Sequence, residues 1–102
     1  MECWGTMSLN NYRDEAGDFL NKIGAINDGS NTDEKVSMLE EEFNILKEVT
    51  DDPDRLKHQI YDMLFILFEI ASDYEFDLDN EWDKGRKHKE EKYISKCKNN
   101  FI

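Results

Sequence analysis

Acidic side chains at two places in this sequence are the residues best suited to chemistry. Glu40, Glu41 and Glu42 form an uninterrupted run, and Asp62 stands inside Ile60–Ile70, a segment in which nine of eleven residues are apolar. A helix that is apolar nearly all round is normally buried, and an ionised carboxylate there is costly unless a cation or a hydrogen-bond donor meets it. We therefore expect Asp62 to have a partner, and a divalent cation shared with the upstream acids would serve.

The oxygens available for such a cation suit a hard divalent ion. Magnesium prefers oxygen ligands and is usually held by a few carboxylates together with water and substrate phosphates. Glu41, Glu42 and Asp62 supply carboxylates, and Gln59 adds a neutral oxygen one helical turn before Asp62. A magnesium or manganese ion held there would polarise a phosphoryl oxygen and orient an attacking water. The predicted metal ligands are therefore Glu41, Glu42, Gln59 and Asp62.

A second interpretation of the same acids needs no cation. Glu42 could be half-exposed at the margin of its apolar stripe, and Asp62 could share one solvated strip with Glu69 and Asp73. Asp62 could also accept a hydrogen bond from a nearby donor: Tyr12, Tyr93 or His58. Spacing alone leaves both interpretations open.

Charge is unevenly distributed along the chain. The net charge is −11, but residues 83–98 carry seven Lys or Arg and three acids, a local +4, which leaves −15 on the rest. An acidic body with one basic helix is poorly suited to broad nucleic-acid binding, yet its basic helix could hold a small anion such as a phosphate. The candidate phosphate contacts are Lys84, Arg86, Lys87 and Lys92, although a solvated helix that offsets an acidic bundle explains them equally well.

The elements that must position these side chains are helices. Apolar residues recur at three- and four-residue steps in four segments, separated by turn-forming residues: 8–23, 32–49, 53–74 and 77–95. Gly24 supplies a stop, and Asn31 or Thr32 can cap the second helix, Asn31 with Glu34 as in a capping box. Asp52 and Asp77 are expected to cap the last two helices. The inward-facing candidates of the last helix are Leu78, Trp82, Gly85, Tyr93 and Ile94.

These elements predict an all-α protein, specifically a four-helix up-down bundle with the 53–74 helix as its central rod. We expect an N-terminal arm (1–7), a single helical domain (8–98) and a C-terminal tail (99–102), and a homodimer whose apolar central helix lies near the subunit contact. No membrane-spanning run or signal peptide is evident, and Cys3 and Cys97 are most simply free thiols, so the expected compartment is the cytoplasm.

The order of the elements resembles the MazG-like, all-α nucleoside triphosphate pyrophosphohydrolases, particularly their short phage-type members. Four stretches carry the resemblance, which extends over about residues 9–95: Met38–Val49, Ile60–Phe68, Phe76–Asp79 and Lys89–Tyr93. It implies a helical bundle in which E-x-x-E and E-x-x-D motifs bind magnesium. It also implies a nucleotide substrate, cut between the α and β phosphates to give a monophosphate and pyrophosphate.

The motifs are only half present. Glu42 matches the first position of E-x-x-E, but the second position is Ile45; shifting by one makes Glu41 the first and Asn44 the second, with poorer agreement of the apolar positions. Asp62 matches the Asp of E-x-x-D, but its Glu partner is Gln59. Each lost acid removes charge that would offset the dehydration of the cation, so metal affinity is expected to be much reduced. The competing hypothesis is a non-catalytic acidic interaction protein. Such a protein could be phage-encoded and could mimic DNA to inhibit a nucleic-acid-binding enzyme.

Overall fold

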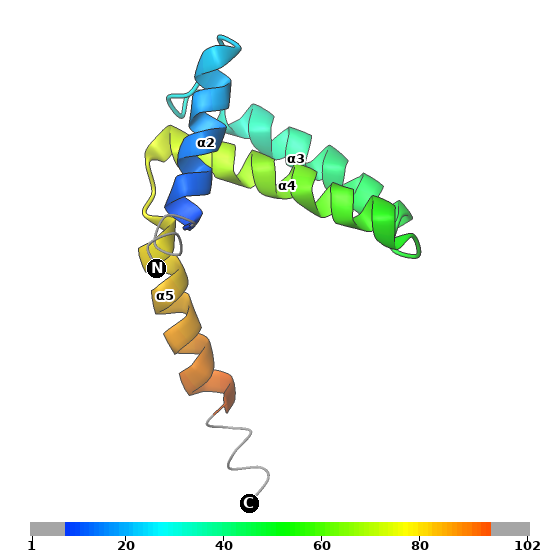
Figure 1. Cartoon of the computed structure of the whole chain (residues 1–102), viewed down its shortest axis with the longest axis vertical. Helices are drawn as coiled ribbons and strands as arrows, with labels where there is room; N and C mark the ends of the chain where they lie inside the picture. The colour runs from blue at the N-terminus through cyan, green and yellow to red at the C-terminus, as the bar shows by residue number, and fades with distance from the viewer. Residues whose placement is uncertain (1–7, 95–102) are drawn as a thin grey trace, which may run out of the picture.

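A computed structural model describes residues 8–94. Its elements are α2 (Leu9–Lys22), α3 (Thr32–Glu48), α4 (Pro53–Tyr74), α5 (Leu78–Lys89) and a short π-helical turn, η1 (Glu90–Ile94). The all-α prediction is confirmed, and α4 is the central helix, because both α2 and α3 pack against it (Figure 1). The predicted N-terminal arm, the C-terminal tail and both cysteines lie outside the described residues. Within residues 8–94, no helix is long and apolar enough to cross a membrane.

Three of the predicted helix ends are confirmed. The side chain of Asp52 accepts a hydrogen bond from Arg55 N, with Pro53 at the first position of α4, and the side chain of Asp77 accepts one from Asn80 N. Gly24 has a φ of +73° just after α2, a conformation that glycine adopts without strain.

The predicted capping box at the start of α3 is wrong. Asn31 occupies the N-cap position but makes no side-chain cap hydrogen bond. The hydroxyl of Thr32 instead lies 2.5 Å from the hydroxyl of Tyr74 and 3.1 Å from the carbonyl of Gly29. The loop before α3 is therefore fastened to the end of α4, and tertiary contacts rather than a local cap define this helix start.

Helix α2 crosses one side of α4 through small and aromatic residues. Phe19 meets Phe65 edge-on, with ring centroids 5.4 Å apart, and Tyr12 lies 5.9 Å from Phe68. Ala16 on α2 is fully buried. The small residues let the two backbones approach, and the aromatic rings close the edges of the contact.

Gly17 is required for this approach, and we expect Gly17→Ala to lower the free energy of unfolding by about 1–3 kcal/mol. A Cβ on Gly17 would lie 2.2 Å from Ser72 Oγ and 3.3 Å from Ser72 Cβ, so α2 or the serine must move. Gly85→Ala is the matched control, because it also replaces a glycine within a helix, while the added Cβ meets no atom within 4 Å. Urea unfolding should show a loss for Gly17→Ala only; equal midpoints for the two variants would contradict the close packing.

Helices α3 and α4 form an antiparallel hairpin with a polar seam. Two rows of side chains with alternating three- and four-residue steps face each other: Lys35, Leu39, Glu42, Leu46 and Val49 on α3, and Gln59, Asp62, Ile66, Glu69 and Asp73 on α4. Direct contacts join Gln59 to Glu42 at one end and Lys35 to Asp73 at the other. Much of the interface that a hairpin normally fills with apolar side chains is therefore polar.

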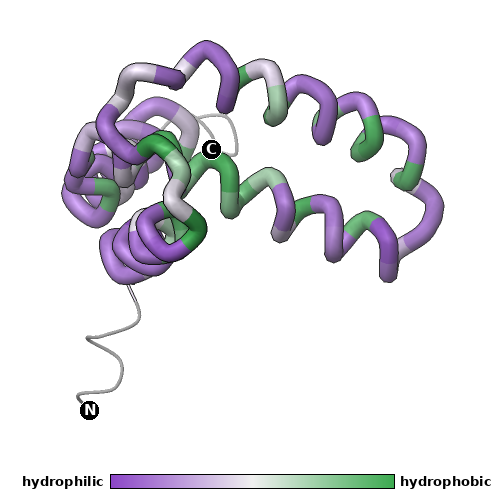
Figure 2. Tube along the Cα trace, turned by 90° about the horizontal axis from the view of Figure 1, so that it is seen from above, coloured by the Kyte–Doolittle hydropathy of each residue, from purple (hydrophilic) through white to green (hydrophobic). Residues whose placement is uncertain are grey.

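The apolar side chains of the hairpin lie beside this seam. Since Glu42 contacts Gln59 in an antiparallel pair, the next residues, Phe43 and Ile60, lie on one common face, and Val36 and Leu67 follow on the same face seven residues away. All four, together with Leu64, are between 45% and 49% exposed. We call these five residues the outer face of the hairpin. Figure 2 shows the resulting alternation of apolar and polar segments along both helices.

Helix α5 leaves the packed part of the molecule, pointing away from the hairpin (Figure 1). The prediction that its apolar residues face inward is wrong for this chain alone: Trp82 is 67% exposed, Tyr93 54% and Ile94 53%. Along its described length, α5 packs mainly against the start of α2. The sequence pattern correctly identified an apolar side, but in the described structure that side is not covered.

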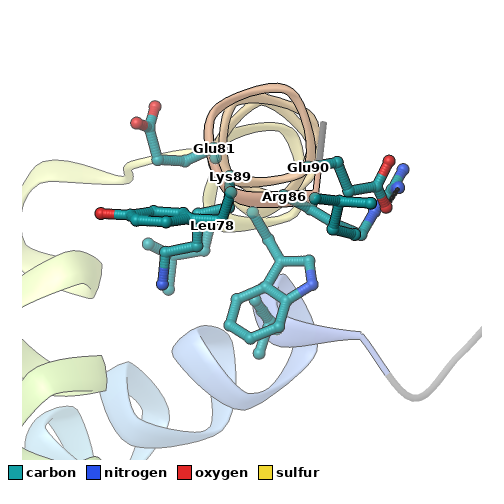
Figure 3. Close-up of a pocket in the computed structure, with 10 residues that line it drawn as sticks. Leu78, Glu81, Arg86, Lys89 and Glu90 are labelled. Carbon is teal, nitrogen blue, oxygen red and sulfur yellow. Dashed lines mark hydrogen bonds and ion pairs between the residues drawn. The ribbon is translucent and has the colours of Figure 1, made fainter. Parts of the chain in front are cut away.

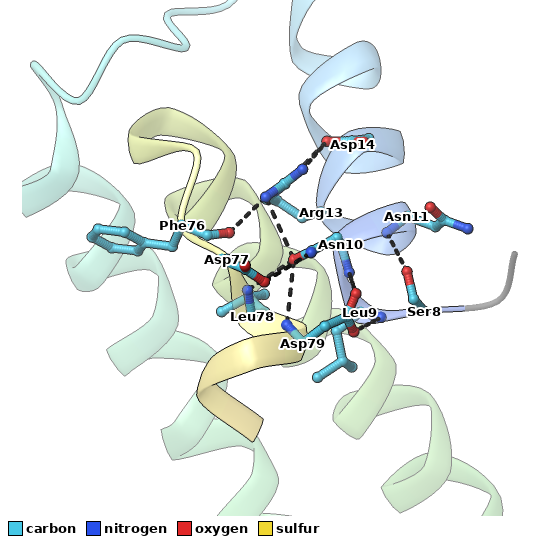
Figure 4. A network of polar contacts seen from close by, with 10 residues as sticks. All are labelled: Ser8, Leu9, Asn10, Asn11, Arg13, Asp14, Phe76, Asp77, Leu78 and Asp79. Carbon is cyan, nitrogen blue, oxygen red and sulfur yellow. Dashed lines mark hydrogen bonds and ion pairs between the residues drawn. The ribbon is translucent and has the colours of Figure 1, made fainter. Parts of the chain in front are cut away.

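A reciprocal set of caps joins α5 to α2 (Figure 4). The carboxylate of Asp79 accepts a hydrogen bond from Leu9 N at 2.9 Å, and the side-chain oxygen of Asn10 accepts one from Leu78 N at 2.8 Å. The Asn10 amide also donates to Asp77 at 3.0 Å, and this hydrogen bond is the main reason that the pKa of Asp77 is lowered. Each helix start is thus satisfied by a side chain of the other helix, which fixes the direction of α5.

Candidate functional site between α3 and α4

The predicted metal ligands Glu42 and Gln59 are brought together by the hairpin. The Gln59 amide nitrogen donates to Glu42 Oε1 at 2.5 Å and also to the Glu42 backbone carbonyl at 3.0 Å. Gln59 is 6% exposed, so both hydrogen bonds lie in the interior. The sequence correctly predicted that these two positions face each other, and the structure adds that they are joined directly.

This geometry does not fit a magnesium ion between the two side chains. An amide N–H is a donor and cannot coordinate a cation, and both oxygens in front of it are acceptors. Turning the amide over would place its oxygen against a carboxylate and a carbonyl, which is repulsive. The Gln59–Glu42 hydrogen bond therefore satisfies Glu42 directly. With a carboxylate at position 59, a cation between the two side chains would have to do so.

The cavity next to Gln59 is also poorly suited to a cation. It has a volume of about 340 Å³ and is lined by Ile45, Val49, Asp54, Arg55, His58 and Gln59. The guanidinium of Arg55 repels a cation, and Ile45 offers it no ligand. Ile45 is the position at which the E-x-x-E motif would have its second acid, so this wall of the cavity is apolar where the motif would be charged.

The remaining predicted ligands lie apart from this hydrogen bond. Asp62 Oδ2 lies 3.3 Å from His58 Nε2, one turn back on α4, and its side chain is 35% exposed. Of the three donors considered from the sequence, His58 is the one that the structure places within ion-pair distance of Asp62. Glu41 is exposed on the outside of α3. Within residues 8–94, no group of three or more Asp, Glu, His or Cys is arranged to hold a metal ion.

The predicted phosphate contacts are engaged within α5 and η1. Arg86 pairs with Asp83 at 2.7 Å and with Glu90 at 2.9 Å, and Lys87 pairs with Asp83 at 3.2 Å. The hydrogen bonds from Arg86 and Lys87 lower the pKa of Asp83. Lys84 lies 3.8 Å from Glu81, and Lys92 lies over the ring of Tyr93. Because α5 points away from the hairpin (Figure 1), these side chains and Glu42 do not line one site within a single copy.

The most deeply buried charges within residues 8–94 include a lysine that the sequence analysis did not single out. Lys35 is 3% exposed, and its ammonium lies 2.5 Å from Asp73 Oδ2 and 3.3 Å from the carbonyl of Ile26. The Asp73 side chain is fully buried. The prediction of a solvated strip through Glu69 and Asp73 is therefore wrong, because both lie in the seam and face Lys35.

Glu69 is the carboxylate that the apolar run buries. It is 7% exposed, whereas Asp62, the acid singled out from the sequence, is at the surface edge. Burial raises the pKa of Glu69, while the charge of Lys35 lowers it and that of Asp73 raises it. A raised carboxyl pKa favours the folded state at low pH, and that contribution is lost as the pH rises through the folded-state value.

A regular spacing could have identified this cluster. Lys35 and Glu42 occupy the same stripe as Leu39, Leu46 and Val49, with steps of four and three residues, which is the pattern of a buried helix face. A lysine at such a position predicts a buried acid opposite. The register set by Glu42 and Gln59 places Lys35 level with Ile66, and Asp73 lies two turns further along the same row of α4, where the lysine ammonium meets it.

We compared the chain with protein-family models, with curated proteins and with solved structures, and nothing matched.

Proposed function

We propose that this protein is a non-catalytic relative of the MazG-like all-α pyrophosphohydrolases, which keeps the helical scaffold and acts as a self-associating acidic interaction protein. One observation carries the proposal: the Gln59 amide donates to both Glu42 Oε1 and the Glu42 carbonyl. The position where the family would place an acid and a magnesium ion holds an amide that donates a hydrogen bond to Glu42 instead.

A glutamine in place of an acid at position 59 is favourable for a scaffold that holds no metal. Two facing carboxylates without a cation repel each other and raise each other's pKa, so an acid at position 59 would destabilise a metal-free hairpin. An amide satisfies Glu42 without a cofactor. Gln59 is thus a residue suited to a chain that folds and functions without magnesium.

Self-association is supported by the outer face of the hairpin. Five large apolar side chains are about half exposed there, while much of the seam inside the hairpin is polar. Adjacent exposed apolar side chains of this kind mark interaction surfaces. A second hairpin packed on the outer face would complete a four-helix bundle with a continuous apolar centre, and Leu64 and Leu67 would lie at that centre.

The class of outside partner follows from charge. A chain of net −11 presents an acidic surface that favours basic partners and excludes nucleic acid. A protein that normally binds nucleic acid offers the complementary basic surface, and binding through it weakens as salt is raised.

Pyrophosphate release is the test of the non-catalytic assignment. The wild-type chain should release pyrophosphate from common and modified nucleoside triphosphates, with magnesium or manganese, no faster than Glu42→Ala and Asp62→Ala variants. Both variants change groups at the predicted metal site, so they report the background of the preparation. Turnover by the wild type that either substitution reduces tenfold or more would overturn the proposal.

A further inference from the structure

The α5 extension, which is α5 together with η1 (residues 78–94), carries an apolar groove of about 690 Å³. The groove lies along the extension and the beginning of α2 (Figure 3), and its apolar lining is Leu9, Leu78, Trp82, Gly85, Tyr93 and Ile94. Charged side chains, among them Arg86 and Lys89, stand at its rim. Within residues 8–94, this apolar surface is separate from the outer face of the hairpin.

The extension cannot cover this groove by folding back on its own hairpin. The joint between α2 and α5 fixes the direction of α5, and that direction leads away from α3 and α4 (Figures 1 and 4). A helix of only a few turns is marginally stable on its own and depends on packing of its apolar side. The groove therefore needs a partner that is not this copy's hairpin.

Charge indicates where that partner surface lies. The extension as a whole (78–94) carries five cationic and five acidic side chains, but three of the acids stand before residue 84, so residues 84–94 have a net charge of +3. Residues 40–54, the end of the hairpin formed by the second half of α3 and the start of α4, contain seven acids and one lysine, a net charge of −6. Ile45, which is 41% exposed, stands among these acids on the side of α3 away from Phe43 and the outer face. The same chain thus carries an apolar groove with a basic end and an acidic hairpin end with an apolar side chain outside the hairpin contact proposed above.

We propose that the α5 extension docks onto a second copy of this chain, with its basic end against the acidic hairpin end of the partner and its groove over Ile45 there. The exchange is reciprocal, so a two-fold axis generates two identical contacts. The inference rests on the self-association proposed above and specifies how the two copies engage. It also assigns a role to the basic residues of α5, which in one copy reach no site on the hairpin.

Charge-swapped variants test this contact. One variant is Lys89→Glu/Lys92→Glu on the extension, and the other is Glu48→Lys/Asp51→Lys on the hairpin end; all four residues are exposed and none caps a helix. Lys89→Glu/Lys92→Glu changes residues 84–94 from +3 to −1, so both contacts of its homodimer place acidic surfaces together. Glu48→Lys/Asp51→Lys changes the hairpin end from −6 to −2, so both contacts of its homodimer lose most of their attraction. In an equimolar mixture, the heterodimer keeps the wild-type charges, +3 against −6, at one of its two contacts. Glu15→Lys/Asp33→Lys, which makes the same charge change elsewhere, is the matched control.

Sedimentation equilibrium at low salt measures the outcome, with circular dichroism to confirm equal helix content. We expect both charge-swapped variants to dimerise more weakly than the wild type, Lys89→Glu/Lys92→Glu by at least about tenfold, the equimolar mixture to associate more tightly than Lys89→Glu/Lys92→Glu alone, and the control to remain unchanged. Dimerisation of both variants at wild-type affinity, while Ile60→Glu/Leu67→Glu is monomeric, would overturn the docking and leave the hairpin contact standing. A wild type that is monomeric at all concentrations would instead overturn the self-association itself.

Discussion

Lys35→Met is expected to lower the free energy of unfolding by about 3–5 kcal/mol at neutral pH, the largest loss of stability for any single substitution in the hairpin. Lys35 is the cation that faces the fully buried Asp73 side chain and lowers the pKa of Glu69. Methionine fills a similar volume but leaves two buried carboxylates without a counter-charge. Urea unfolding followed by circular dichroism measures the loss.

The pH dependence of this loss follows from the same contacts. Removing Lys35 raises the pKa of Glu69 further, because the charge that lowers it is gone. A carboxyl whose folded-state pKa is raised stabilises the fold below its unfolded value, near pH 4, and that stability is lost as the pH rises. The variant should therefore be closest to the wild type near pH 4 and furthest from it near pH 7.

Two controls separate the buried charge from lysine removal in general. Lys84→Met removes an exposed partner of Glu81, 3.8 Å away, and should change stability by no more than about 0.5 kcal/mol. Lys35→Met/Asp73→Leu removes both members of the buried pair and should recover most of the loss. If Lys35→Met were no worse than Lys84→Met, the buried cluster would not exist in solution.

Ile45→Glu/Gln59→Glu is expected to create the cation site that the wild type lacks. Both positions line the cavity beside Glu42, so the introduced carboxylates complete the two four-residue motifs around one point. Without metal, the facing acids should lower the melting temperature. Manganese at one hundred times its dissociation constant adds about 2.7 kcal/mol, which is a rise of about 10 °C or more for a domain of this size.

The matched control moves one acid to the wrong face of α3. Asn44→Glu/Gln59→Glu has the same charge, but residue 44 is exposed and lies outside the cavity. Differential scanning calorimetry with and without manganese should show a large rise only for Ile45→Glu/Gln59→Glu. An equal rise in melting temperature for the control would mean that manganese binding depends on net charge and not on the geometry of the cavity.

The helices could be predicted from the sequence because their signals are local. Asp52 with Pro53 and Asp77 mark helix starts through contacts within one turn, and the apolar period of α4 needs no tertiary context. The start of α3 could not be predicted in this way, because Thr32 is held by Tyr74, which lies forty-two positions further along the chain. Local sequence patterns therefore predict the helices well, but they do not predict the long-range contacts that join them.

The candidate site was predictable in position and not in chemistry. The register that brings Glu42 to Gln59 follows from two helices joined by a short turn, but whether an amide or a cation satisfies the acid depends on atomic orientation. Lys35 was missed because lysines are usually exposed, and one in a buried stripe is recognised only when its acid is placed opposite. The direction of α5 depends on the Asn10 joint, which pairs residues nearly seventy positions apart.

A calorimetric titration of the wild-type chain with manganese tests the central claim most directly. If the Gln59–Glu42 hydrogen bond has replaced the cation, the wild type should show no saturable binding under conditions in which Ile45→Glu/Gln59→Glu binds stoichiometrically. Saturable binding by the wild type that Glu42→Ala abolishes would contradict the account.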